Sequence, residues 1–342
     1  MFVNIKDRLA DSAVRKILSC CLWDKSPEGV DEALRRYPDE QFYGWVENDE
    51  PLGVCGFRAL PNAVEVCHIA VAERARGRGV GGAMVAALRE AYGAVIAAET
   101  HDGAVDFYRK CGFAATLFYK YNEALKLKYR RWMCVLPSPK PFDALTDGER
   151  DALYPIILSE YDPAWPAWFT EEKAELTRLI GAENIARISH YGSTSVPGLP
   201  AKPTVDIMLE IPETADVDAL IAALPAPDYI CLTGEALTMP TPPPHLMIIK
   251  GYTPAGFSEK LYHIHVQYLG DPEQFYFRDY LIAHPETAAE YAALKRELSR
   301  DFKYDRDDYT DAKGAFVREV TARARGDPNE SADLLGRGGA AK

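Results

Sequence analysis

The sequence predicts an α+β protein built from two domains. Strand-like and helix-like segments are interspersed along 342 residues, and this length exceeds that of one ordinary domain. The charge also changes along the chain, because residues 1–140 hold 20 Lys and Arg against 18 Asp and Glu, whereas residues 141–342 hold 19 against 33. Each part has its own loop of small residues, at 77–82 and at 192–195. We therefore expect a boundary near residue 140.

Composition excludes several classes of function. The chain has a net charge of −12, and its excess of acidic residues lies in the second part. This part gives nucleic acid little electrostatic attraction, so no nucleic-acid partner is expected. No run approaches the roughly 18 apolar residues of a membrane span, and charged residues interrupt the N-terminus, so we expect neither a membrane partner nor a signal peptide. Seven cysteines without a C-x-x-C pair are typical of reduced thiols. A cytoplasmic location follows as an expectation.

Periodicity assigns the elements of the first part. Apolar residues at helical spacing predict helices, whereas alternating or continuous apolar runs bounded by turns predict strands. The predicted helices cover residues 7–22, 31–36, 83–92 and 103–111. The predicted strands cover residues 42–47, 52–60, 63–71, 94–100, 114–121 and 129–136.

The most informative stretch of this part is residues 67–88, where a short apolar strand leads into the glycine loop and then into a helix. Glycines let the backbone approach a ligand closely, successive N–H groups can point at an anion, and a helix N-terminus adds partial positive charge. The stretch therefore predicts a pyrophosphate site. In a dinucleotide-binding unit such a loop follows the first strand, whereas here it follows about three.

Two motifs make the first domain resemble the GNAT superfamily of N-acetyltransferases. The acetyl-CoA signature of that family, Arg/Gln-x-x-Gly-x-Gly/Ala after a central strand, appears as Arg76, Gly79 and Gly81. The second motif, HDGAVDFYRKCGF, matches the family at Ala104, Phe107, Tyr108, Lys110, Gly112 and Phe113, and has His101 where the family often has Asn. The resemblance implies a mixed, mostly antiparallel sheet flanked by helices over residues 1–137.

The resemblance also implies acetyl transfer from acetyl-CoA to a small amine by direct attack. Backbone N–H groups of the loop would bind the pyrophosphate, and the strand before it would pair with the pantetheine arm. Exposed loop arginines, Arg74 among them, would either meet CoA phosphates or stay in solvent. The residues implied in cofactor binding are Ile69, Val71, Arg76, Gly77, Arg78, Gly79, Val80, Gly81, Gly82 and His101.

Two residues of the first domain are expected to transfer protons. Tyr108 matches the family's tyrosine and would protonate the leaving thiolate, the alternative being a core tyrosine. Glu65 lies upstream on the central strand and would accept the amine's proton, the alternative being a solvated carboxylate at the strand end. Alternation turns His68 to the opposite face, so it is a weaker candidate for the base, and a buried, hydrogen-bonded histidine is the simpler interpretation.

The second part begins after a proline-rich linker predicted at residues 138–153. Thr170 is the expected N-cap of the first helix that follows. The last segment, residues 326–342, is predicted to be a flexible tail. Other predicted elements are helices at 171–180, 275–283 and 288–302, a strand that ends the segment 188–211, and a strand at 261–269.

Residues 154–325 resemble the GrpB family, which is placed in the nucleotidyltransferase-like superfamily. The shared residues are His190, the segment GSTSVPGL, Lys202, Pro203 and Asp206, followed by HIHV, FRDYL, HPE, Tyr309, Thr310 and Lys313. The resemblance implies an α/β sheet with a helical extension and a module that binds a nucleotide or a similar anion.

Nucleotidyltransferases hold phosphate on a Gly-Ser loop and bind Mg²⁺ through two acids spaced one residue apart on a strand. Asp206 fits the first acid, but Met208 holds the second position, and Glu210 lies about 13 Å farther along an extended strand. His263 and His265 share one face of their strand and can either supply ligands to a metal softer than Mg²⁺ or pack in the core.

Three interpretations of the second domain stay open: a ligand-binding module, a divergent transferase, or a histidine-assisted divalent metal site with Asp206 as a ligand. The expected site residues are His190, Gly192, Ser193, Thr194, Ser195, Lys202, Asp206, His263 and His265. The whole chain is predicted to be an N-acetyltransferase fused to a nucleotide-binding module. The alternatives are a non-catalytic CoA sensor, and a nucleotidyl or phosphoryl transferase acting through the second domain.

Overall fold

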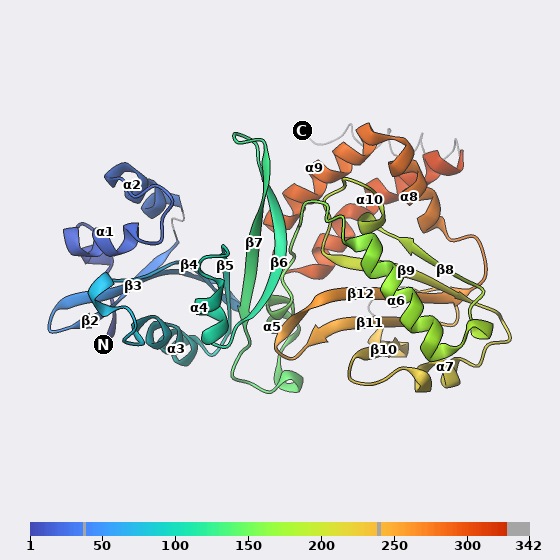
Figure 1. The fold of residues 1–342 in the computed structure, drawn as a ribbon, viewed down its shortest axis with the longest axis horizontal. Coiled ribbons are helices and arrows are strands. Elements are labelled where there is room, and N and C mark those ends of the chain that lie inside the picture. Colours follow the sequence, from blue (N-terminus) through green and yellow to red (C-terminus); the bar gives the residue numbers. More distant parts are fainter. Residues whose placement is uncertain (37–38, 238–240, 327–342) are drawn as a thin grey trace, which may run out of the picture. The chain divides into compact units, whose positions relative to one another are not determined.

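The computed structural model describes residues 1–36, 39–237 and 241–326, and the chain divides into two compact units (Figure 1). Unit 1 consists of Met1–Thr116, Arg131–Tyr154 and Pro254–Gly256. Unit 2 consists of Leu117–Arg130, Pro155–Thr253 and the chain from Phe257 onward. The expected α+β class with two domains is confirmed, and each unit has a sheet and a core.

The first sheet has seven strands in the order β1-β2-β3-β4-β5-β7-β6. β4 and β5 run parallel, whereas the pairs β1–β2, β2–β3, β3–β4 and β5–β7 are antiparallel, so the sheet is mixed and mostly antiparallel as expected. Its strands are β1 (Phe2–Asn4), β2 (Gln41–Glu47), β3 (Glu50–Ala59), β4 (Ala63–Val71), β5 (Val95–Thr100), β6 (Ala114–Asn122) and β7 (Leu127–Leu136).

Amphipathic helices cover this sheet and close the first core. Val14, Ile17 and Leu18 fall on one face of α1 and are buried, which is why the segment is helical. Met84 and Leu88 of α3 are fully buried in the same core. The helices are α1 (Ser12–Ser19), α2 (Pro27–Arg36), α3 (Val80–Tyr92) and α4 (Val105–Lys110), so the helix predicted at 7–22 is shorter at both ends.

The segment predicted to be a linker is partly helical. It contains α5 (Asp147–Leu153), which begins with a capping box formed by Thr146 and Glu149. Glu149 also pairs with Lys140 at 2.6 Å. A capping box is visible in a sequence, but the prolines that precede this helix favoured an extended linker instead.

The second sheet has five strands in the order β10-β11-β12-β9-β8. Its central pair, β9 and β12, runs parallel and sets His263 opposite Asp206. The strands are β8 (Arg187–Tyr191), β9 (Thr204–Ile211), β10 (Tyr229–Thr233), β11 (Leu246–Thr253) and β12 (Gly256–Tyr268). The strands predicted at the end of 188–211 and at 261–269 are thereby confirmed, and the second starts earlier than expected.

The two faces of this sheet have different coverings. Residues of β9 and β12 that alternate with Asp206 and His263, such as Ile207 and Ile264, form a core with α6 (Trp165–Ile180) and α7 (Val217–Ala223). Three helices form an extension of the domain (Figure 1): α8 (Glu273–Ala283), α9 (Pro285–Asp301) and α10 (Arg306–Arg325). They pack on one another through a cluster that includes Leu281, Tyr291 and Val320.

Helix α6 begins earlier than expected, and the N-cap predicted at Thr170 is wrong. The helix starts at Trp165, with Pro166 in its first turn, where proline is well tolerated. Thr170 lies inside the helix and its hydroxyl donates to the carbonyl of Pro166 at 2.9 Å. The sequence favoured Thr170 as the N-cap because the aromatic residues before it do not mark the start of the helix clearly.

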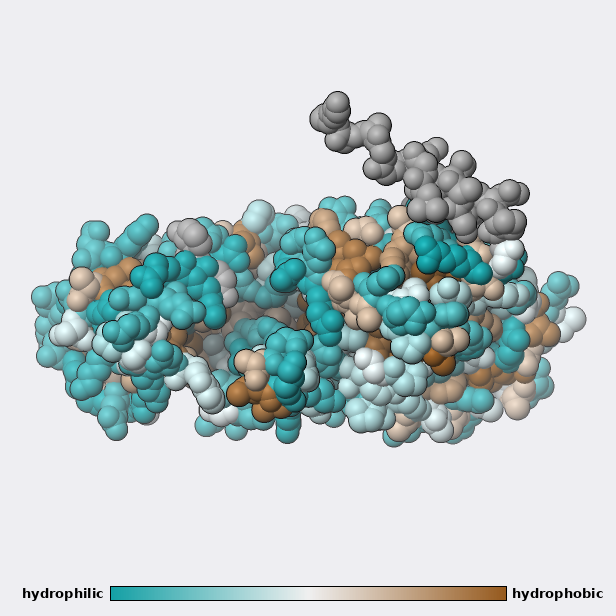
Figure 2. Space-filling view, turned by 90° about the horizontal axis from the view of Figure 1, so that it is seen from above, coloured by the Kyte–Doolittle hydropathy of each residue, from teal (hydrophilic) through white to brown (hydrophobic). Residues whose placement is uncertain are grey.

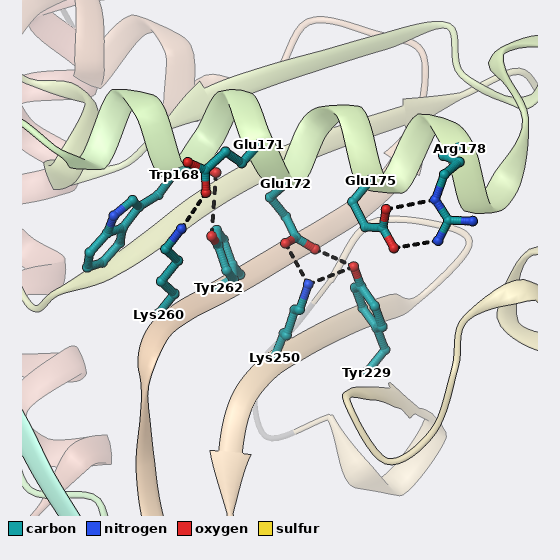
Figure 3. A network of polar contacts seen from close by, with 9 residues as sticks. All are labelled: Trp168, Glu171, Glu172, Glu175, Arg178, Tyr229, Lys250, Lys260 and Tyr262. Atoms are coloured by element: carbon teal, nitrogen blue, oxygen red, sulfur yellow. Dashed lines mark hydrogen bonds and ion pairs between the residues drawn. The ribbon is translucent and has the colours of Figure 1, made fainter.

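A polar network joins α6 to the sheet (Figure 3). The carboxylate of Glu172, a residue that is 3% exposed, accepts hydrogen bonds from the Tyr229 hydroxyl at 2.5 Å and from Lys250 Nζ at 2.7 Å. Glu171 and Glu175 on the same helix form the more exposed pairs with Lys260 and Arg178. The helix is therefore attached to β10 and β11 by charge as well as by apolar packing.

The described surface is largely polar. In the view of Figure 2 hydrophilic residues cover most of the face and apolar residues gather in small patches. Among the described residues, none of the helices combines the length and the apolar character that crossing a membrane requires. The tail predicted at 326–342 lies outside the described residues except for Gly326.

Candidate functional sites

The glycine loop of the first domain has the backbone shape that its sequence predicts. Gly77 and Gly79 have φ of 76° and 81°, in the left-handed region that favours glycine. Gly79 is also the N-cap of α3 and has no side chain with which to cap the helix. The N–H groups of Val80, Gly81 and Gly82 therefore lie in the first turn, where a helix offers donors to an anion.

Gly81 joins the two motifs of this domain. A Cβ atom at Gly81 would lie 2.7 Å from Cε2 of Phe107, closer than real carbon atoms approach. The loop motif and the Phe-Tyr motif are therefore packed directly against each other, through α3 and α4. This contact gives a physical reason why the two motifs occur together.

The central strand β4 loses its neighbour on one side before the loop begins. Its parallel pairing with β5 ends at Val66 opposite Ala98, whereas its pairing with β3 continues to Val71 opposite Gly53. In the register of the described strands, residues 68–71 thus lie beyond the end of the ladder with β5. Ile69 and Val71, which were expected to contact the cofactor, lie on this stretch, so its backbone can pair with an extended ligand.

Tyr108 is buried beside this region, with 5% of its surface exposed. Its ring packs edge-on against Phe107 and Phe113, at centroid distances of 5.1 and 5.2 Å. Burial raises the pKa of Tyr108 well above its ordinary value of 10. The phenol is protonated at physiological pH, as a general acid must be, and burial makes it a weaker acid than an exposed tyrosine.

The two candidates for the base are both bonded to other side chains. Glu65 accepts from Arg58 at 3.3 Å, and Arg58 also pairs with Asp39 at 3.0 Å. His68 Nδ1 lies 2.7 Å from a carboxylate oxygen of Glu40 in the core, as the interpretation of a buried, hydrogen-bonded histidine expects. Glu65 keeps 16% of its side chain exposed, so it is the more accessible of the two.

Several residues that were expected to bind the cofactor already form hydrogen bonds or ion pairs within the protein. Arg74 pairs with Glu50 at 2.8 Å and Arg78 with Glu47 at 3.1 Å, both at exposed positions. Arg76 donates to the carbonyl of Val71 at 3.4 Å. His101 Nδ1 accepts from the Gly103 N–H at 3.1 Å. These contacts lie at exposed positions, so a phosphate-bearing ligand can compete for the arginines at little cost in free energy.

The second domain encloses a cavity of about 920 Å³, bounded by the sheet and by residues of α8, α9 and α10. The sequence-predicted residues that line it are Gly192, Ser193, Thr194, Lys202, Asp206, His263 and His265. Two predicted residues do not line it: His190 stacks on Phe169 and contacts the Thr194 hydroxyl at 3.0 Å, and Ser195 donates to the Gly192 carbonyl at 2.6 Å. They contact the small-residue loop but do not line the cavity.

Gly192 brings the loop into contact with the carboxylate of Asp206. Its φ is 69°, and a Cβ atom there would lie 2.8 Å from Asp206 Cγ and still closer to Oδ2. The closeness of loop and strand therefore depends on the missing side chain. Asp206 sits on the floor of the cavity, and burial raises its pKa to about 6 although neighbouring lysines act in the opposite direction.

Cationic side chains outnumber carboxylates in the lining of this cavity, six against four. Lys202, Lys295, Arg306 and Lys313 all line the cavity. Lys295 is 2% exposed and donates to the Ser193 hydroxyl at 3.1 Å and to the carbonyl of Pro200. Burial, together with the other cations, lowers the pKa of Lys202 and Lys295, and burial lowers that of Lys313 to about 8. The lining as a whole therefore has an excess of two positive formal charges.

The second acid of a nucleotidyltransferase site is absent from this cavity. Met208 is buried, and the Glu210 carboxylate is held by Arg187, at 2.7 Å through one of its nitrogens, and by the Gly270 N–H at 3.1 Å. Glu210 therefore serves the fold at the end of β9. Neither Met208 nor Glu210 lines the cavity, whose other acids, Glu273, Asp307 and Asp311, come from α8 and α10.

His263 and His265 instead converge on Asp206. One ligand-type atom from each of the three residues lies within 4.8 Å of the others, and His263 Nδ1 is 3.7 Å from Asp206 Oδ1. His263 Nε2 contacts the Tyr252 hydroxyl at 2.7 Å, and His265 packs edge-on against Tyr191. Burial lowers the pKa of His263, as Lys202 does to a smaller extent, and burial alone lowers that of His265 to about 4.

Among the lining residues that sequence reasoning missed are Tyr252, Lys295 and Arg306. A signal existed for Lys295, which continues the buried positions Tyr291 and Ala292 of α9 and is a charged residue on an apolar face. Nothing marked Tyr252 or Arg306, because β11 was not predicted and α10 begins in a run of charged residues.

Two family models match the chain, "Acetyltransferase (GNAT) family" over residues 12–113 and "GrpB protein" over residues 155–323. UPF0157 protein PA4798 of Pseudomonas aeruginosa is 33% identical over 193 residues, which are 55% of this chain and 75% of that protein. UPF0157 protein YqkA of Bacillus subtilis is 27% identical over 299 residues, 84% of this chain and 77% of that protein. The solved structure of conserved protein GrpB from Enterococcus faecalis is 29% identical, with a TM-score of 0.41, over 49% of this chain and 96% of that one. The chain therefore belongs to the GrpB family, and it carries a GNAT acetyltransferase domain ahead of its GrpB domain.

Proposed function

We propose that the first domain is an acetyl-CoA-dependent N-acetyltransferase that acts on a small amine. The observation that carries this proposal is that β4 continues past the end of its ladder with β5 and leads directly into the glycine loop and the first turn of α3. An extended pantetheine arm can pair with residues 68–71, and the pyrophosphate can then accept from the N–H groups at the start of α3.

The side chains near this stretch suit direct transfer. The amine nitrogen attacks the thioester carbonyl, the C–N bond forms, and the C–S bond breaks as the thiolate leaves. Tyr108, which is protonated at physiological pH, supplies a proton to that sulfur. Glu65 is the proposed acceptor of the amine's proton, and it must first loosen its contact with Arg58.

The test is thiol release from acetyl-CoA by the full-length protein with a panel of small amines. Tyr108→Phe keeps the ring and removes the acid, so we expect kcat to fall by about 10² or more while CoA affinity stays unchanged. Phe113→Tyr is a control that leaves Tyr108 in place. Tight CoA binding without release from any amine would favour a CoA sensor, and absence of CoA binding would contradict both functions.

We further propose that the second domain binds a nucleotide or a similar phosphate-bearing anion in its cavity. The excess of six cationic over four acidic side chains in the cavity lining supports this, because a phosphate would offset the surplus positive charge. The cavity volume is within the range of small-molecule sites. Binding is favoured over nucleotidyl or phosphoryl transfer because Glu210 is held elsewhere.

Calorimetric titration of the full-length protein with inorganic phosphate and with ATP tests this second function. We expect Lys313→Met to weaken phosphate binding about tenfold or more, since a charged hydrogen-bond donor is lost. Lys173→Met, at an exposed position of α6, is the matched control and should bind phosphate normally. Release of pyrophosphate from ATP would instead favour a transferase.

A further inference from the structure

We propose that Asp206, His263 and His265 bind a divalent transition-metal ion, and that this ion and the phosphate-bearing anion bind cooperatively in the same cavity. This inference rests on the anion site proposed above, and it adds a metal ion to that site. It starts from the one group of three potential metal-ligating side chains that converges in the described part of the chain.

The backbone places the three ligands together. β9 and β12 run parallel with Asp206 opposite His263, and His265 follows two residues later on the same face of β12. The distance of 3.7 Å between Asp206 Oδ1 and His263 Nδ1 is only slightly longer than two ligands of one metal ion require. Small side-chain rotations are therefore sufficient to complete a site.

The surroundings of His263 have the form of a metal ligand's outer shell. When Nδ1 binds a metal ion, Nε2 carries the proton and needs an acceptor. The Tyr252 hydroxyl lies 2.7 Å from Nε2, and its ring stacks on the imidazole at a centroid distance of 5.6 Å. Arg306 in turn donates to the Tyr252 oxygen at 3.3 Å. Tyr252 is therefore a positioning residue for His263.

The ligand set selects the kind of ion. Two imidazoles and one carboxylate suit zinc, cobalt, iron or manganese better than magnesium or calcium, which prefer an all-oxygen set. Three protein ligands leave at least one coordination position open. That position faces a cavity whose lining includes Lys202 and Lys313.

Electrostatics then requires the anion. The three ligands carry one negative charge, and the cavity lining holds six cationic against four acidic side chains, so its surplus positive charge disfavours a dication alone. A phosphate removes that repulsion because it neutralises the lysines, and one of its oxygens can occupy the open position of the metal ion. Each ligand must therefore raise the affinity of the other, and by the same factor.

The experiment measures Co²⁺ binding to chelator-treated, full-length protein by visible absorption and calorimetry, with and without inorganic phosphate at concentrations below precipitation. We expect phosphate to strengthen Co²⁺ binding by about tenfold or more, and Co²⁺ to strengthen phosphate binding by the same factor. The absorption spectrum should show nitrogen ligation. Equal or weaker Co²⁺ affinity in the presence of phosphate would overturn the inference.

Variants assign the site. His265→Ala should abolish Co²⁺ binding and the enhancement while phosphate alone still binds, and His284→Ala, a histidine that does not line the cavity, should change neither. Tyr252→Phe keeps the stacked ring and removes the acceptor, so we expect Co²⁺ affinity to fall about 10–100-fold. Co²⁺ binding that survives His265→Ala would overturn the inference. Phosphate binding without any Co²⁺ binding would refute this inference alone, whereas absence of both would refute the anion site as well.

Discussion

At the scale of single residues, two glycines bring together parts of the chain that side chains would separate. Gly81 lets α3 approach Phe107, and Gly192 lets the small-residue loop touch Asp206. Their neighbours differ in kind, since one is an aromatic ring packed on the core and the other a half-buried carboxylate. Substitution at Gly192 therefore has a functional consequence that can be separated from its effect on stability.

We expect Gly192→Ala to destabilise the second domain by about 1–3 kcal/mol and to weaken phosphate binding about tenfold or more, because the new methyl group displaces the Asp206 carboxylate. Gly198→Ala is the matched control. Gly198 also has a left-handed φ, of 80°, but nothing lies within 4 Å of the position that a Cβ atom would take, so this variant should lose stability and keep phosphate affinity. Calorimetric titration and thermal unfolding measure the two effects, and equal phosphate affinity in both variants would contradict the role of Gly192.

Lys313 gives the anion site a pH dependence. Burial holds its pKa at about 8 in the free protein, and a bound phosphate stabilises the charged ammonium and raises that pKa. Binding above pH 8 must therefore take up a proton, so we expect phosphate affinity, measured without metal, to fall as pH rises from 8 to 9.5. In Lys313→Met this fall should be smaller. An affinity that rises over the same range would show that Lys313 does not contact the anion.

At the scale of elements, α6 shows how a charged residue can stabilise a packing interface. Glu172 is buried between Tyr229 and Lys250, whereas Glu171 and Glu175 make exposed pairs from the same helix (Figure 3). Breaking a charged hydrogen bond in a buried setting costs more than losing an exposed ion pair.

We therefore expect Glu172→Gln to lower the thermal midpoint of the second domain by about 4–8 °C, corresponding to about 2 kcal/mol. Glu175→Gln should leave that midpoint nearly unchanged, because its pair with Arg178 is exposed. Scanning calorimetry of the full-length protein measures both. A similar loss in the two variants would mean that helix propensity, and not the buried network, explains the effect of Glu172.

The elements also show which parts of the fold the sequence could predict. β4, β9 and α3 were predictable, because their apolar patterns are strong and their ends are marked by glycines or turns. α10 was not, since its first turn is rich in Asp and its buried face consists of Tyr309, Val320, Thr321 and Ala322, a weak apolar stripe. Motifs located Asp206 and the two histidines, but their convergence depends on the parallel pairing of β9 with β12, which no local pattern states.

At the scale of the whole molecule, the chain has two apolar cores that share no residue among those described. Such cores can unfold in separate transitions, and a ligand stabilises only the domain that binds it. We expect acetyl-CoA at about 100 times its Kd to raise one calorimetric transition by about 5–10 °C, and phosphate to raise the other. A single transition that moves with either ligand would show that the domains unfold together.

The parallel pairing of β9 with β12 has a consequence for how the second site forms during folding. Asp206 and His263 are separated by a stretch of chain that itself forms β10 and β11, so the carboxylate and the imidazoles meet only after this intervening part has folded and returned to the sheet. Such long-range closure is slow and forms late. A chain cleaved between the two strands would still contain every residue of the site, but these residues would not be brought together. Ligand binding is therefore a stringent test of complete folding.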